Sequence, residues 1–199
     1  MAGLGTRTWM ARTAGRLAWR DRLTIIAAAV AARARTRILP QKGRPPRRLE
    51  VEAIIPPETA ITREAIAISQ EASAPFLFNH CLRAYFWARL LDDGSQPFDD
   101  EAVFTALMLH DLGLTEQHRR RTGADQCFTA IGARSVAELA AKHHWSDRRA
   151  HVAAEAITLH LNVVVGASRG KEAQLVRVGS GADVAGLGLD GLQPSPPPY

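Results

Sequence analysis

Apolar residues recur at helical spacing through most of the chain after residue 50. The first stretch follows Pro56 and Pro57 and presents a broad apolar face over residues 60–68, which predicts a helix. Stretches of the same kind predict helices over residues 78–91, 99–112, 130–142, 147–161 and 172–184, the last interrupted at Gly179 and Gly181. No strand-length run alternates between apolar and polar residues. We therefore predict an all-α fold, a helical bundle without internal repeats.

The two ends of the chain differ from this helical body. Residues 41–48 (QKGRPPRR) combine two prolines with repelling charges, so they predict a linker that places the start of the folded domain near Val51. We expect a basic arm over residues 1–50, a domain over residues 51–190 and a Pro-rich tail over residues 191–199. Within the arm, residues 23–32 are apolar but too few to span a bilayer. They predict a frayed, Ala-rich segment that either forms a helix on the body or is disordered. The alternative is that they belong to a targeting sequence.

Charge is divided unevenly between the arm and the rest of the chain. The net charge is +5, to which residues 1–50 contribute +10 and the remainder −5. A basic terminal arm indicates contact with an anionic membrane or with nucleic acid. The body carries no nucleic-acid-binding motif, so we expect no specific nucleic-acid partner. Cys81 and Cys127 are the only cysteines and lack CxxC spacing. Their pattern excludes a zinc ribbon and favours a reducing compartment, so we expect a cytoplasmic protein.

The candidate chemistry begins with His110 and Asp111, adjacent residues near the end of an apolar helix. Neighbouring helical positions point about 100° apart, so both side chains reach one ion only where the helix end borders a cavity. His80 and Asp183, on other predicted helices, lie in equally apolar settings, where an unpaired polar group is costly. Three helices thus each bring a nitrogen or oxygen ligand to one centre. Imidazole with carboxylate suits one divalent ion of Zn, Fe, Mn or Co better than Mg or Ca.

The order and spacing of these residues resemble the HD-domain superfamily of metal-dependent hydrolases, in which a His, a His-Asp pair and a distant Asp lie on an all-α fold. The likeness covers residues 54–188 and is similar to the branch that includes the cyanamide hydratases. It is carried by the segments PFLFNHCLR (75–83), LHDLG (109–113), GA (132–133), AITLH (156–160) and GSGADVAG (179–186). The resemblance implies an HD-domain helical bundle whose metal ligands are His80, His110, Asp111 and Asp183.

Two further residues are candidates for the reaction itself. His160 ends the AITLH segment and is similar to a recurrent pocket histidine of that branch, so we expect it to orient substrate or to move a proton. A hydrogen-bonded histidine at a helix end is the alternative. Arg83 lies three positions after His80 and shares its helix face, where it would bind an anionic substrate or pair with a carboxylate. The His143-His144 pair indicates a helix end in preference to a second metal site.

Three functions are compatible with this pattern. The first is a metal-dependent hydrolase acting on a small molecule, in which the ion activates water for attack on a phosphoryl group or similar electrophile. Asp111 would steer that water, and His160 would serve the leaving group. The second keeps the site but adds water across a nitrile, as a cyanamide hydratase does. The third is a non-catalytic HD-domain protein whose site is vestigial and whose arm binds a membrane or a partner.

Overall fold

The computed structural model describes residues 5–13, 18–21, 23, 24, 27, 51–118 and 127–189. Within these residues the chain is all-helical and contains no strand, as the apolar spacing predicts. The longer helices are α3 (Ala60–Ala72), α4 (Pro75–Leu91), α5 (Asp100–Leu109), α7 (Phe128–Lys142), α8 (Asp147–Leu159) and α9 (Lys171–Ala185). The shorter elements are α1 (Arg7–Thr13) and three 3₁₀ turns, η1 (Val51–Ala53), η2 (Leu112–Leu114) and η3 (Ala167–Arg169).

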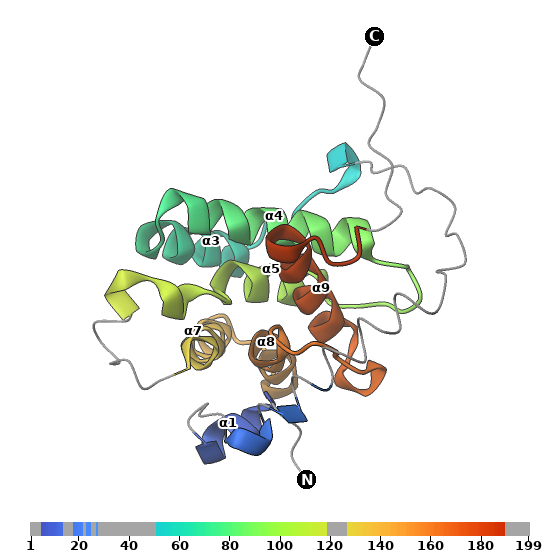
Figure 1. Ribbon diagram of the computed structural model, residues 1–199. Coiled ribbons are helices and arrows are strands. Elements are labelled where there is room, and N and C mark those ends of the chain that lie inside the picture. The colour runs from blue at the N-terminus through green and yellow to red at the C-terminus, as the bar shows by residue number, and fades with distance from the viewer. Residues whose placement is uncertain are drawn as a thin grey trace.

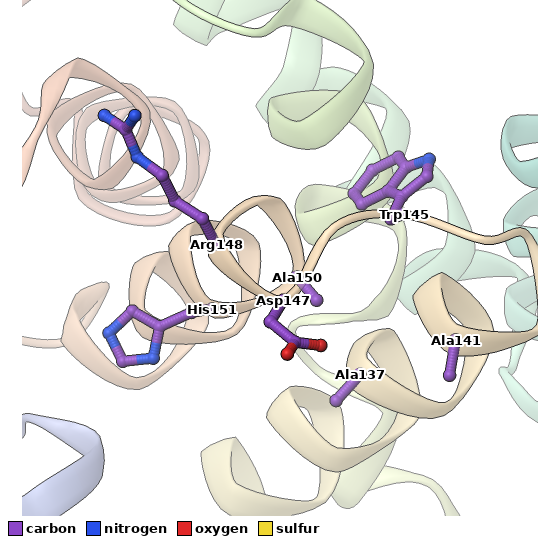
Figure 2. Close-up of a pocket in the computed structure, with 7 residues that line it drawn as sticks. All are labelled: Ala137, Ala141, Trp145, Asp147, Arg148, Ala150 and His151. Carbon is purple, nitrogen blue, oxygen red and sulfur yellow. The ribbon is translucent and has the colours of Figure 1, made fainter.

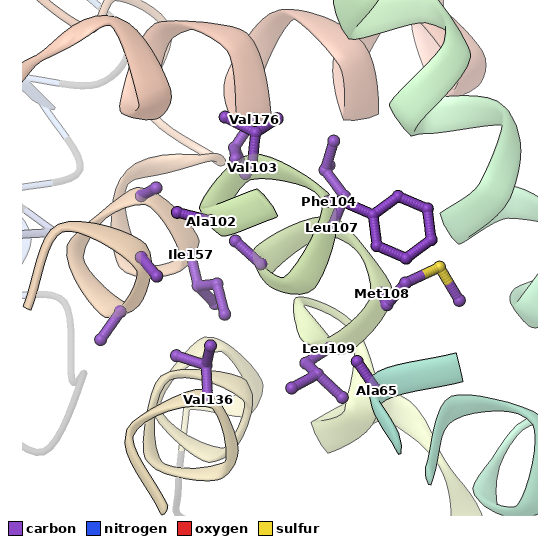
Figure 3. Packing of buried hydrophobic residues seen from close by; sticks show 14 of the residues in the cluster. Ala65, Ala102, Val103, Phe104, Leu107, Met108, Leu109, Val136, Ile157 and Val176 are labelled. Carbon is purple, nitrogen blue, oxygen red and sulfur yellow. The ribbon is translucent and has the colours of Figure 1, made fainter. Parts of the chain in front are cut away.

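Helix α5 is the centre of the bundle. It lies between α3 and α4 on one side and α7 and α8 on the other, and α9 packs against α4, α5 and α8 (Figure 1). Residues 102–109 are all buried, because a helix that is apolar all round has no face suited to water. Figure 3 shows these side chains packed against Ala65, Val136, Ile157 and Val176, one from each of four surrounding helices. This packing fixes the C-terminal end of α5 in the interior.

Three predicted details of the helices are wrong. Helix α8 ends at Leu159 instead of Leu161, with His160 as its C-cap. Helix α5 ends at Leu109 instead of continuing to Leu112, because His110 is its C-cap and the chain then tightens into η2. Helix α9 is continuous through Gly179. A Cβ atom at Gly179 would lie 2.2 Å from the carbonyl oxygen of Ala84 on α4, so this glycine permits close helix packing and does not break the helix.

The N-terminal helix α1 packs against α8. Trp9 and Met10 are buried there. Gly5 adopts a φ of +77°, and a Cβ atom at Gly5 would lie 3.1 Å from the carbonyl oxygen of Thr158. The linker expected at residues 41–48 and the tail expected at residues 191–199 lie outside the described residues, so the domain boundaries remain predictions. Among the helices of the described part, none is long and apolar enough to cross a membrane.

Candidate metal centre

A buried cluster of two histidines and one aspartate lies at the C-terminal end of α5. His80 comes from α4, while His110 and Asp111 form the turn between α5 and η2. The Nε2 atoms of His80 and His110 lie 3.2 Å apart, and Asp111 Oδ2 lies 3.5 Å from the first and 3.4 Å from the second. These three side chains form the group that could hold a metal ion.

The end of helix α5 explains how two adjacent residues face one centre. His110 keeps helical angles, whereas Asp111 has φ −106° and ψ 9°, outside the helical region. Gly132 of α7 holds the turn from behind, since a Cβ atom there would lie 2.5 Å from the Leu109 carbonyl oxygen and 2.9 Å from that of His110. The turn and the close helix contact thus bring both side chains to the same side.

Backbone and side-chain acceptors fix the orientation of both rings. His110 Nδ1 lies 2.7 Å from the carbonyl oxygen of Leu107, and His80 Nδ1 lies 2.8 Å from Asp183 Oδ2. A carbonyl and a carboxylate only accept hydrogen bonds, so each Nδ1 carries the hydrogen and donates it. In a neutral ring the Nε2 opposite a donating Nδ1 carries a lone pair, and the Nε2 atoms of His80 and His110 face one another beside the carboxylate of Asp111. We call His80, His110 and Asp111 the acceptor cage, because its facing atoms are two ring nitrogens and a carboxylate oxygen, which can accept hydrogen bonds or bind a metal ion.

The electrostatics and the spacing of the acceptor cage both suit a cation. Burial lowers the pKa of His110 to about 4, so this ring is neutral at neutral pH and its Nε2 can bind a metal ion. Burial also raises the pKa of Asp111. Two ligand atoms that each lie about 2.1 Å from a tetrahedral ion are about 3.4 Å apart, which matches the separations of 3.2, 3.4 and 3.5 Å in the cage. The donor set therefore fits a divalent transition metal ion.

Asp183 lies on the outer side of this cage. Its carboxylate accepts the hydrogen bond from His80 Nδ1 and two more from Arg83, from Nε at 2.7 Å and from Nη2 at 2.9 Å. The Arg83 hydrogen bonds hold the pKa of Asp183 below its usual range despite partial burial. Pairing with a carboxylate is thus the arrangement that the structure shows for Arg83. The structure does not bring Asp183 into the group of three, and its role as a ligand remains a prediction.

His160 approaches the cage from the C-terminal end of α8. Its Nδ1 lies 2.6 Å from the Ile157 carbonyl oxygen, so this nitrogen donates and Nε2 is again bare. Nε2 lies 3.9 Å from Asp111 Oδ1, and the His160 ring stands edge-on to His110 at a centroid distance of 4.9 Å. Burial lowers the pKa of His160 to about 4. The side chain is neutral beside the cage and able to accept a proton.

Sequence reasoning missed the groups that orient these histidines. The carbonyl oxygens of Leu107 and Ile157 each lie three residues before a histidine at a helix end, and that spacing is the only signal in the sequence. Sequence reasoning also did not predict that Phe128 borders the site. Its ring packs edge-on against that of His160, with 5.9 Å between the ring centroids. Its position at the first residue of α7 gives no local indication of this contact.

Two other candidate groups take no part in the proposed chemistry, although Cys81 Sγ lies 3.9 Å from His110 Nδ1. Cys81 is buried, and its burial raises the pKa of the thiol to about 12, so it is not a nucleophile. Helix α7 ends at Lys142, as the histidine pair predicts, and His143 Nε2 lies 2.9 Å from Glu64 on α3. That contact joins two helices and leaves His143 outside the acceptor cage.

A separate hollow of about 520 Å³ lies between α7 and the start of α8 (Figure 2). It includes none of the candidate metal ligands. Its lining is Ala137, Ala141, Trp145, Asp147, Arg148, Ala150 and His151. Trp145 is covered by the guanidinium of Arg149, 3.8 Å from the ring centroid. This hollow is therefore distinct from the metal centre.

The HD-domain family model matches residues 77–183, more than half of the chain. The chain therefore belongs to the HD-domain family. The matched segment begins in α4 before His80 and ends in α9 at Asp183, so it spans both the acceptor cage and its outer carboxylate. No curated protein sequence matches the chain. The narrower likeness to cyanamide hydratases remains a prediction.

Proposed function

We propose that this HD-domain protein is a metal-dependent hydrolase that binds one divalent transition metal ion, Zn, Fe, Mn or Co. The acceptor cage carries this proposal, because two imidazole Nε2 atoms and a carboxylate oxygen lie within 3.5 Å of one another in a buried setting. Such a group of nitrogen and oxygen atoms suits a divalent transition metal ion. In this proposal His80, His110 and Asp111 hold the ion where the structure places them, and Asp183 becomes the fourth ligand by exchanging its hydrogen bond with His80 Nδ1 for the ion.

When bound, the ion would lower the pKa of a water molecule and supply hydroxide near neutral pH. Asp111 has one oxygen toward the cage and the other toward His160, 3.9 Å away. This placement lets its carboxylate orient the attacking water. His160 is neutral and presents a bare Nε2, so it takes up a proton and returns it to the leaving group.

The substrate class that we propose is a phosphate ester of a small molecule. A second reaction, hydration of a nitrile, is favoured by one observation. The side chain of Arg83 is paired with Asp183, so it does not offer a free cation to a phosphate. Nitrile hydration needs no anion-binding group and no leaving group, and the buried setting of His110 and His160 suits a small apolar substrate.

Metal analysis followed by a parallel substrate panel tests this proposal. The purified chain should contain close to one equivalent of a divalent transition metal ion. It should release phosphate or nucleoside from nucleotides, phosphomonoesters or phosphodiesters. Urea formed from cyanamide would instead support the hydratase. A metal-loaded protein inactive toward every substrate in the panel would favour the vestigial alternative.

His160→Gln separates the proton-transfer role from metal binding. We expect the turnover rate to fall about 10²-fold or more while metal content stays near one equivalent. The matched control is His151→Gln on the exposed side of the same helix, which should leave the rate unchanged. An equal rate in both variants would remove His160 from the mechanism.

A further inference from the structure

The basic arm carries an exposed apolar stripe. Trp19 and Leu23 are helical, with 66% and 56% of their surface exposed, and Ala27 is also helical and exposed. The spacing of four residues places the three side chains on one side of a helix. We call Trp19, Leu23 and Ala27 the arm stripe. Large apolar groups grouped on one exposed face indicate a binding surface.

Basic charge lies next to this stripe. The guanidinium of Arg20 lies 5.3 Å from the centroid of the Trp19 ring. Residues 1–50 contain 12 Lys and Arg against two acidic residues. One of these acids, Asp21, accepts a hydrogen bond of 2.9 Å from the Ala18 amide, as a residue in the first helical turn does. The acid therefore serves the local helix start, and Arg20 is the described cation beside the stripe.

We infer that the arm stripe docks on an anionic lipid bilayer surface. A tryptophan and a leucine on one face, with arginine beside them, are the features of helices that lie in a membrane interface. The +10 charge of residues 1–50 is complementary to anionic headgroups, whereas the rest of the chain has the opposite sign, −5. Nucleic acid would use the arginines alone and leave the apolar stripe in water.

Helix α1 connects the arm stripe to the helical body, because it packs against α8. It immediately precedes this part of the arm and buries Trp9 and Met10 against α8. Binding of the stripe to lipid would therefore recruit the HD domain. This inference uses none of the residues of the metal centre, so it stands or fails independently of the proposed hydrolase.

Vesicle co-sedimentation of the full chain tests the inference. We expect the protein to sediment with vesicles of phosphatidylcholine and phosphatidylglycerol in equal parts, to remain in solution with phosphatidylcholine alone, and to dissociate as salt is raised. The double variant Trp19→Ala/Leu23→Ala should bind the anionic vesicles about tenfold more weakly or worse. Arg20→Gln should bind about fivefold more weakly.

The matched control removes apolar side chains of the body that are even more exposed, in the double variant Ile55→Ala/Phe76→Ala, whose residues are 82% and 74% exposed. Its vesicle binding should equal that of the unmodified chain, and circular dichroism should show helical content retained in every variant. Equal binding of both double variants would overturn the inference. Binding of duplex DNA in place of vesicles, or a dimer that only Trp19→Ala/Leu23→Ala dissociates, would also overturn it.

Discussion

The two ends of helix α5 carry polar clusters of opposite kinds. At the N-terminal end, the Tyr85 hydroxyl donates to the carboxylate of Asp100 at 3.0 Å, and Arg89 donates both to that carboxylate and to the Tyr85 oxygen. Burial raises the pKa of Tyr85, so its hydroxyl stays protonated and continues to donate. Donors and acceptors are matched within this cluster, which we call the closed network.

The acceptor cage at the C-terminal end instead brings together atoms that could hold a metal ion. His80 donates from Nδ1 to Asp183, and His110 donates from Nδ1 to the Leu107 carbonyl oxygen. The Nε2 atom of each ring faces the carboxylate of Asp111. Both clusters are built on α4 and α5, but the closed network is the more exposed: the Arg89 and Asp100 side chains are 29% and 31% exposed, against 1% to 10% in the cage. The comparison teaches that the closed network balances its carboxylate with its own cation, Arg89, whereas the cage joins two histidines to a carboxylate and suits a bound metal ion.

The largest effect that we expect comes from Asp111→Asn. The amide keeps one oxygen that can face the cage but loses the negative charge, so some metal should remain while the turnover rate falls about 10²- to 10⁴-fold. Metal content and turnover should be measured on the same samples. A rate within a few fold of the unmodified protein at equal metal loading would leave Asp111 without a role in orienting water.

The next largest effect that we expect comes from a substitution that moves the cage residues without changing their chemical groups. In Gly132→Ala the new methyl group would meet the backbone oxygen of Leu109 at 2.5 Å, so α7 must move away from the turn that presents His110. We expect a loss of about 3 kcal/mol in the free energy of unfolding together with weaker metal binding. Both quantities can be followed by urea unfolding with and without added metal.

Gly166→Ala is the control for that substitution. Gly166 has a φ of −68°, and its nearest contact for an added Cβ atom is an ordinary 3.9 Å. The free energy of unfolding should be unchanged or slightly raised. Equal losses in the two variants would mean that the close contact at Gly132 does not constrain the turn.

These glycines show where sequence reasoning reached its limit. Apolar spacing was enough to predict the all-helical fold, and the resemblance to HD domains identified the residues that form the cage. Gly179 was predicted to interrupt α9, yet it lies inside the helix against α4, because close approach between helices distant in sequence leaves no local pattern. The end of α5 at Leu109 depends in the same way on the packing of α7.

The orientations of the histidine rings could not be predicted from the sequence for a related reason. The hydrogen of His110 is assigned by the carbonyl of Leu107, and that of His80 by Asp183, more than 100 residues later in the chain. A pattern of residue types contains no information about which ring nitrogen is bare. Which ring nitrogens face Asp111 is therefore shown by the structure and not by the sequence.

A smaller effect should follow when the closed network loses one donor. Tyr85→Phe removes the hydroxyl but leaves Arg89 to pair with Asp100, so we expect a loss of about 1 kcal/mol in the free energy of unfolding. Metal affinity should not change. A large drop in metal affinity would show that the two clusters are not independent.

The smallest effect is a pH dependence at the N-terminal end of α5. Burial raises the pKa of Asp99, but hydrogen bonds from Arg149 outweigh burial, and the net pKa lies below its usual value. A lowered carboxyl pKa in the folded state adds stability above the unfolded value of about 3.9 and loses it as the pH falls further. Arg149→Gln should therefore lower the free energy of unfolding at pH 7 by about 1 kcal/mol or less, and by less still near pH 3. An equal loss at both pH values would contradict this assignment.

Calorimetric titration of the metal-free protein with Co²⁺ tests the need of the acceptor cage for a cation most directly. The unmodified chain and Tyr85→Phe should each bind close to one ion with the same affinity. His110→Ala and Asp183→Ala should each lose most of this binding, by about 10- to 100-fold or more in affinity. Unchanged Co²⁺ affinity in His110→Ala, or no binding by the unmodified chain, would contradict the assignment of the cage as a metal centre.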